Sequence, residues 1–355
     1  MKLKAYNYQI EVLTPVAILS GEKIRKFEVI KEGNKAYVLN FERLIRDEKG
    51  FVDLLVANPK ILTNPDELLN VFKRFNINYR KDIKHEVRGY MRRSFEINEF
   101  IKSNGKPYIP GSSLKGALRT NIIRGTKFGN YYIKFIEFAK SHNKLVKSAE
   151  VPDSKICGNS YQSPFKFLRV SDTNLLKENV LQVKPIEIYD LLKKKKVLDT
   201  IYSEFLPVGT KLYGEINLSF YDYIKQFYFK DEYKNLEILD DFIKKVRKGV
   251  EKYIKDEISI MQEIGEVGLA SFYRKLLNLN LKENQILIQL GFSTGFYSKT
   301  LVGKLSRENV IYLKKMVGKR GNKYDPRLFP KTRRVIDENG VRKPLGWILM
   351  TIEEK

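Results

Sequence analysis

The segment 108–119, Tyr-Ile-Pro-Gly-Ser-Ser-Leu-Lys-Gly-Ala-Leu-Arg, is suited to binding a phosphate group. Its proline and glycine end the preceding structure, a serine can cap a new helix, and apolar residues then recur at helical spacing. A helix N-terminus offers unpaired N–H groups and a partial positive charge, and two basic residues follow one turn apart. The alternative is an ordinary capped helix with solvated basic side chains. The residues predicted to form this phosphate site are Gly111, Ser112, Ser113, Lys115 and Arg119.

A second glycine segment, 291–300, has the sequence Gly-Phe-Ser-Thr-Gly-Phe-Tyr-Ser-Lys-Thr. Its two glycines let the backbone approach a ligand closely, and its aromatic rings could stack on bases. It is not a nucleotide-binding P-loop, which requires a Gly-Lys-Ser or Gly-Lys-Thr ending. A tight turn with aromatic residues in the core is the alternative. The residues predicted to contact a ligand are Gly291, Phe292, Gly295 and Lys299.

A basic segment lies near the C-terminus of the sequence. Residues 304–343 contain 13 Lys or Arg and 4 Asp or Glu, and residues 80–119 show a similar bias with ten basic and four acidic residues. Arginine suits bidentate phosphate contacts and stacking on bases. Trp347 opens an apolar run, so we expect it to be a core anchor. The residues of this segment predicted to bind phosphates are Lys331, Arg333 and Arg334.

The composition favours a nucleic-acid partner. The 355 residues include 66 Lys plus Arg and 42 Asp plus Glu, a formal charge of +24. Such an excess calls for an acidic counterpart, and no amphipathic or lipidated anchor indicates a membrane surface. One cysteine and two histidines exclude an internal disulfide and a zinc site built from several cysteines, and we expect no cofactor or metal. Without a signal-type or membrane-spanning apolar run, the protein is expected to be cytoplasmic.

The elements around these segments predict an α+β fold. Residues 6–12 and 212–220 alternate as strands with one buried face, and 286–290 and 347–352 read as short strands. Segments 64–75 and much of 222–278 have helical character. This order favours two ferredoxin-like (RRM-like) units with antiparallel sheets, helices on one side and inserted helical segments.

The predicted domains meet where strand alternation restarts. We expect an N-terminal ferredoxin-like domain over residues 1–205, with an insertion around 125–200. A C-terminal ferredoxin-like domain would cover 206–355, with a helical insertion around 222–282. No short-period repeat or low-complexity linker marks the boundary.

Several of these segments resemble the RAMP superfamily of CRISPR proteins. Leu13-Thr14-Pro15-Val16, followed by Gly21, resembles the first-strand motif of that superfamily, and the segment 109–116 resembles its most specific internal signature. The series comprising 291–300, Phe-Pro-Lys-Thr-Arg-Arg at 329–334 and Pro-Leu-Gly-Trp at 344–347 is similar to the fifth subunit of the type III-A Csm complex. The motifs extend over most of the chain.

The resemblance implies a guide-RNA-binding subunit in antiviral defence. Such a protein caps the backbone filament near the 3′ end of the guide (CRISPR) RNA, contacts the RAMP backbone subunit and other Csm subunits, and supports guide maturation by recruited host nucleases. The residues named above would then be RNA contacts, with no catalytic residue carried over. The related backbone subunit cuts target RNA with an aspartate between the first strand and the Pro-Gly-Ser-Ser segment. We align to it none of Asp47, Asp53, Asp66 and Asp82.

Three alternatives remain open from the sequence. A metal-independent RAMP-type guide-precursor endoribonuclease would need an acid and a base, for which His85 and His142 are the candidates. A metal-dependent nuclease would gather carboxylates such as those of Asp240, Asp241, Glu263 and Glu266, which instead look like solvated helix faces. A generic RNA-binding protein would share the charge but would not account for the recurring glycine motifs.

Overall fold

The computed structural model describes residues 4–32, 35–48, 50–62, 65–87, 96–142, 150–226, 233–316, 318 and 324–355. The strands are β1 (Ala5–Val12), β2 (Leu19–Ile24), β3 (Val29–Glu32), β4 (Lys35–Leu39), β5 (Ile83–Val87), β6 (Ile97–Phe100), β7 (Lys102–Ser103), β8 (Lys106–Pro107), β9 (Arg169–Val170), β10 (Gln182–Asp190), β11 (Lys195–Phe205), β12 (Lys211–Asn217), β13 (Gln285–Gln289), β14 (Thr332–Glu338), β15 (Val341–Pro344) and β16 (Trp347–Glu354). The helices are α1 (Phe41–Asp47), α2 (Phe51–Ala57), α3 (Pro65–Arg74), α4 (Gly111–Arg124), α5 (Tyr131–Ser141), α6 (Glu150–Cys157), α7 (Ser219–Gln226), α8 (Phe242–Glu263), α9 (Val267–Leu277), α10 (Phe296–Lys299) and α11 (Arg307–Met316). Within these ranges, no helix is long and apolar enough to cross a membrane.

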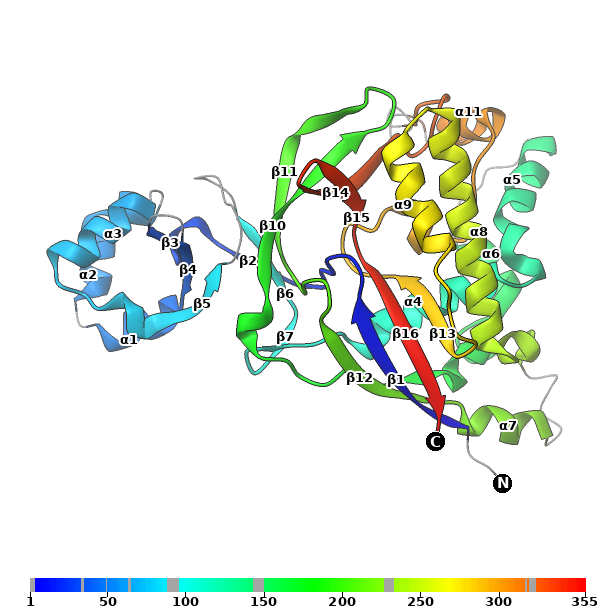
Figure 1. Ribbon diagram of the computed structural model, residues 1–355, viewed down its shortest axis with the longest axis horizontal. Coiled ribbons are helices and arrows are strands. Elements are labelled where there is room, and N and C mark those ends of the chain that lie inside the picture. The colour runs from blue at the N-terminus through cyan, green and yellow to red at the C-terminus, as the bar shows by residue number, and fades with distance from the viewer. Residues whose placement is uncertain are drawn as a thin grey trace.

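The main core lies on a five-stranded antiparallel sheet in the order β13-β16-β1-β12-β9 (Figure 1). As the alternation in the sequence predicted, Tyr8, Ile10 and Val12 of the central strand β1 are buried on one face. Their side chains belong to one apolar cluster with residues of α4, α8 and α9. This burial fixes the strand register, because a shift by one residue would expose the apolar side chains.

A six-stranded sheet, in the order β15-β14-β10-β11-β6-β2, lies beside the first. Its described strand pairs are antiparallel except for β11 and β6, which run parallel. The chain passes from the end of β1 through residues 13–18 into β2, so the loop between the first two strands joins the sheets. This loop forms one wall of the candidate site.

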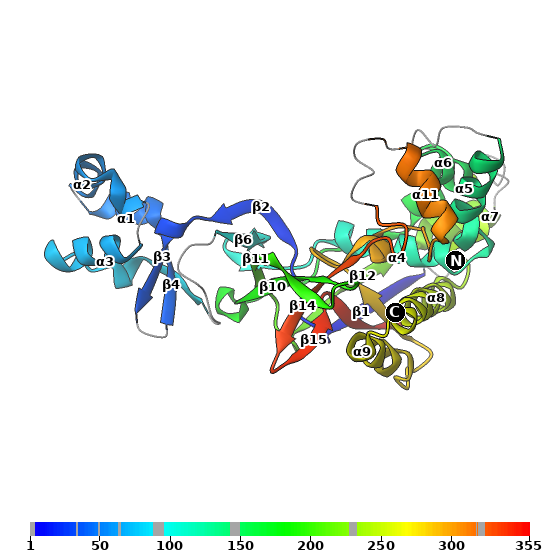
Figure 2. The same ribbon diagram turned by 90° about the horizontal axis from the view of Figure 1, so that it is seen from above.

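The described residues between 25 and 87 form a small unit that the sequence did not predict. It holds the sheet β3-β4-β5 and the helices α1, α2 and α3, and Figures 1 and 2 show it at one end of the molecule. Its own core includes Phe41, Phe51, Phe72 and Tyr79, whose rings contact one another in series. The unit is inserted between β2 and β6, which explains the long interval between the first-strand motif and α4.

The structure confirms the α+β class but not the two ferredoxin-like units. Strand β1 pairs with β12 and β16, so strands from both predicted halves share one sheet across the expected boundary near residue 205. Among the described residues, 125–200 includes β10 and the first part of β11, and 222–282 includes α8 and α9, so the division into domains stays a prediction. The strand predicted for 212–220 ends at Asn217, and Phe220 is an exposed residue of α7.

Helices α4 and α8 touch backbone to backbone through two glycines. A Cβ atom on Gly249 would lie 2.0 Å from the carbonyl oxygen of Asn121, and one on Gly125 would lie 1.9 Å from that of Lys245. Real Cβ atoms do not approach backbone atoms so closely, so any other residue would push the helices apart. Glycine at these positions therefore sets where α4 lies.

We predict that Gly249→Ala lowers the free energy of unfolding by about 1–3 kcal/mol, because a methyl group overpacks the contact between helices. The gain in intrinsic helix propensity, about 1 kcal/mol, acts in the opposite direction. Gly268→Ala in α9 is the matched control, since its Cβ would meet only Glu266 Oε1 at 3.9 Å. Chemical denaturation measures both variants, and a Gly249→Ala protein as stable as the control would contradict the prediction.

Candidate nucleic-acid interface

A groove of about 510 Å³ lies between α4, the loop after β1 and the glycine segment after β13. We call it the α4 groove. It brings together three segments that the sequence singled out separately. Its lining residues are Ile18, Leu19, Ser113, Gly116, Ala117, Arg119, Thr120, Gln289, Leu290, Gly291, Phe292, Ser298 and Lys299.

The N-terminus of α4 already binds a carboxylate. The backbone N–H of Gly111 donates to Asp172 Oδ1 at 2.7 Å, and the N-cap residue is Pro110 rather than a serine. Gly111 is buried, and a Cβ there would lie 2.1 Å from the carbonyl oxygen of Val170. Asp172 therefore occupies the N–H of Gly111, and a phosphate at this terminus stays a prediction. Ser112 is exposed on the first turn outside the groove lining, whereas Ser113 lines the groove.

Basic side chains gather along the outer face of α4. Burial, followed by the nearby charges of Arg169 and Arg119, lowers the pKa of Lys115. Arg119 lines the groove, with its guanidinium 5.3 Å from the centre of the Phe165 ring. Arg169 comes from β9, and the sequence analysis missed it because only the fold brings it beside α4. The neighbouring positive charges of Lys115, Arg119 and Arg169 repel one another, which favours binding of an anionic ligand.

The glycine segment is fastened to the loop after β1. The N–H of Phe292 donates to the carbonyl oxygen of Ala17 at 2.6 Å. Gly291 has a φ of +99°, and a Cβ there would lie 2.3 Å from the same oxygen. Gly291 is thus required for the close approach of two backbones. It also lines the α4 groove, so its contact with a ligand stays a prediction. Gly295 also has a positive φ, of +102°, but faces open space at the start of α10.

A second pair of cations lies at the glycine segment. Burial, and then the nearby charge of Arg334, lower the pKa of Lys299. Arg334 donates to Ser293 Oγ at 3.1 Å and lies 5.7 Å from the centre of the Phe292 ring. Among the described residues, neither Lys299 nor Arg334 forms an ion pair. The predicted residues Phe292, Lys299 and Arg334 are therefore neighbours, and two of them line the groove.

Arg333 lies in the core, contrary to the predicted RNA contact. Its side chain is 6% exposed, and its Nε donates to Glu257 Oε2 on α8 at 3.0 Å. Burial opposes its charge, but the carboxylate of Glu257 outweighs burial and raises the pKa of Arg333. Strand alternation explains why Arg333 is buried while Arg334 is not, because adjacent residues of β14 point to opposite faces. Lys331 is only half-buried, and Trp347 is a buried anchor stacked on Tyr253, as expected.

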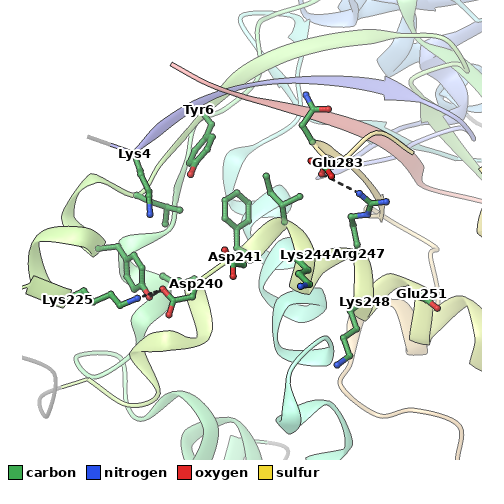
Figure 3. A pocket seen from close by; sticks show the side chains of 16 residues that line it. Lys4, Tyr6, Lys225, Asp240, Asp241, Lys244, Arg247, Lys248, Glu251 and Glu283 are labelled. Atoms are coloured by element: carbon green, nitrogen blue, oxygen red, sulfur yellow. Dashed lines mark hydrogen bonds and ion pairs between the residues drawn. The ribbon is translucent and has the colours of Figure 1, made fainter. Parts of the chain in front are cut away.

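Three of the four acidic candidates for a metal-dependent nuclease, Asp240, Glu263 and Glu266, bind other side chains. Asp240 and Asp241 line a basin of about 1400 Å³ at the start of α8 (Figure 3). There Asp240 accepts hydrogen bonds from Tyr221 Oη and Lys225 Nζ. Glu263 pairs with Lys304, and Glu266 accepts from Tyr189 Oη at 3.0 Å. In the part of the chain that the structure describes, no group of three His, Cys, Asp or Glu side chains could hold a metal ion.

The two histidines lie on different elements, and His142 is not part of the groove lining. His142 is exposed at the end of α5 beside the ring of Phe138. His85 belongs to β5 of the small unit, and its side chain is outside the described part of the structure. The four aspartates considered for target cleavage, Asp47, Asp53, Asp66 and Asp82, also belong to the small unit.

Comparison with known families matches residues 9–269 to the RAMP superfamily, so the chain belongs to that superfamily. It is further similar to proteins named "CRISPR system Cms protein Csm5". The one from Methanocaldococcus jannaschii is 28% identical, with 97% of this chain and 88% of the relative aligned. The one from Streptococcus thermophilus is 27% identical, with 84% and 80% aligned. The resemblance stated from the motifs is thereby confirmed.

Solved structures show the same fold. A chain in the cryo-EM structure of a Csm-crRNA-target RNA ternary complex, from a type III-A CRISPR-Cas system, has a TM-score of 0.72 and 22% identity. The alignment covers 97% of this chain and 100% of that one. The crystal structure of T. onnurineus Csm5 has a TM-score of 0.63 and 20% identity, covering 96% and 99%.

We predict that Arg333→Met lowers the free energy of unfolding by about 3–5 kcal/mol, because it leaves the buried Glu257 carboxylate unpaired. The double variant Arg333→Met/Glu257→Leu should recover much of that loss, since no buried charge remains. Chemical denaturation of the single and double variants measures the difference. A fully stable Arg333→Met protein that binds RNA weakly would restore Arg333 to the RNA-binding set.

Proposed function

We propose that this chain is a non-catalytic subunit of a type III-A Csm effector complex that binds guide RNA in the α4 groove. It would cap the end of the backbone filament near the guide 3′ end. Its partners would be the RAMP backbone subunit, other Csm subunits and recruited host nucleases. The names of its relatives and the solved complex that contains crRNA support this assignment.

The observation that carries RNA binding is the convergence of two groups of cations beside one groove. Lys115 lies near Arg119 and Arg169, and Lys299 lies near Arg334. In the described ranges, Lys115, Lys299 and Arg334 form no ion pair, and each experiences repulsion from a neighbouring cation. A sugar-phosphate backbone would relieve it. The ring of Phe292 and the open backbone at Gly295 leave room for bases beside those phosphates.

A holding role fits the residues around the groove better than a cutting role. Cleavage without a metal needs an acid and a base within hydrogen-bond reach of the scissile phosphate. Among the described residues, the groove lining contains serine, threonine, glutamine, lysine and arginine side chains but no histidine or carboxylate. We therefore expect a guide precursor to stay intact when it binds.

Two double variants test the groove. Lys115→Gln/Arg119→Gln and Lys299→Gln/Arg334→Gln should each weaken binding of single-stranded RNA by roughly 10- to 100-fold at low salt. Each should also reduce the slope of log affinity against log salt by about 1.4, because two phosphate contacts are lost. The loss of affinity should be similar for unrelated RNA sequences, since phosphates carry little sequence information. Titrations at several salt concentrations provide the measurement.

The matched control is Lys244→Gln/Lys248→Gln, which removes the same charge from the basin in Figure 3 and not from the groove. Equal effects of all three double variants would show that binding follows total charge and would reject the groove. Cleavage of a guide precursor by the wild type, abolished by His142→Ala or His85→Ala, would support the endoribonuclease instead.

A further inference from the structure

Arg124, at the end of α4, connects that helix to the glycine segment. It is 6% exposed, and its Nη2 donates to the carbonyl oxygens of Tyr297 at 2.7 Å and Thr300 at 2.6 Å. Its Nη1 donates to Asn121 Oδ1 at 2.7 Å, one turn earlier on α4. The two carbonyls lie on either side of Ser298 and Lys299, so a single guanidinium spans the part of the segment that lines the groove.

Stability of the fold alone does not explain a buried arginine at this position. Within the described residues, no carboxylate forms an ion pair with Arg124. Burial lowers the pKa of Arg124 to about 10, against smaller opposing influences from Tyr253 and Asp256. A charge taken out of water without a paired opposite charge is costly, and an apolar side chain of similar volume would avoid that cost. What the arginine adds is several donors in a fixed geometry.

The segment that Arg124 holds has little regular structure of its own. Helix α10 has only four residues, and its N-cap Gly295 makes no side-chain cap. So short a helix is not stable without outside contacts. On its other side, Tyr297 Oη donates to the carbonyl oxygen of Phe329, and the Arg333 guanidinium lies 5.5 Å from the centre of the Tyr297 ring. Two buried arginines, from α4 and β14, therefore fix its path.

We propose that Arg124 is a positioning residue for RNA binding. By holding the carbonyls of Tyr297 and Thr300, it keeps Lys299 at the groove beside Arg334, where the two cations bind one backbone phosphate. This inference rests on the proposed function, because it assigns a cause to the geometry of that same groove. Helix α4 then has two roles, because its face lines the groove and its Arg124 anchors the glycine segment that forms the opposite wall.

A double-mutant cycle separates this role from a purely structural one. We expect Arg124→Met to weaken single-stranded RNA binding about as much as Lys299→Gln does, by roughly tenfold. In the Arg124→Met background, Lys299→Gln should add less than about a twofold loss, because Lys299 is already displaced. Lys115→Gln should keep its full effect in that background, since it belongs to the other group of cations.

The matched control is Arg247→Met. Arg247 also donates to loop carbonyls, those of Lys282 and Glu283, but it lines the basin and not the groove. RNA affinity should be unchanged in this variant, whatever it loses in stability. Each variant is measured below its unfolding transition, and Arg124→Lys, judged by the same criteria, replaces Arg124→Met if the latter does not fold.

Two results would overturn the positioning role. They are an affinity at the wild-type level in folded Arg124→Met, or fully additive losses when it is combined with Lys299→Gln. The proposed function fails in a different way. If wild type does not bind RNA, or if Lys299→Gln, Lys115→Gln and their combinations have no effect, the groove itself is rejected and the inference falls with it.

Discussion

The fold depends on the direct backbone contact between α4 and α8. Gly125 and Gly249 allow each helix to reach the other's carbonyl oxygens, and this close approach sets the position of α4 over the five-stranded sheet. Helix α8 also carries Tyr253, which stacks on Trp347, and Glu257, which pairs with Arg333. The same contact therefore links the central strands, the buried ion pair and the wall of the α4 groove.

Electrostatics explains why such a groove suits a polyanion. The chain has a formal charge of +24, yet the two buried arginines among the described residues serve internal contacts, one with Glu257 and one with carbonyl oxygens. The cations left at the groove repel one another, and their lysines are partly desolvated. Neutralisation by phosphates would remove that repulsion, which is the physical basis for expecting strong salt dependence.

Local patterns in the sequence predicted the local elements well. The alternation at 6–12, a helix within 108–119 and the buried Trp347 were expected from neighbouring residues, although the helix begins at Gly111 and not after a capping serine. The parts that could not be predicted depend on contacts between distant residues. Asp172 caps α4 from 61 positions away, and Glu257 pairs with Arg333 from 76 positions away. The small unit of residues 25–87 escaped recognition because its aromatic core combines separate helices and a short sheet.

The most direct test of a guide-holding subunit is the identity of the RNA that the chain carries in its own cell. The natively expressed protein would be purified under conditions that preserve its complexes, and the RNA that co-purifies would be sequenced. A Csm subunit at the end of the filament should yield repeat-spacer guide RNAs. Ribosomal or other cellular RNA without repeat-derived sequence would contradict this function and indicate a general RNA-binding protein.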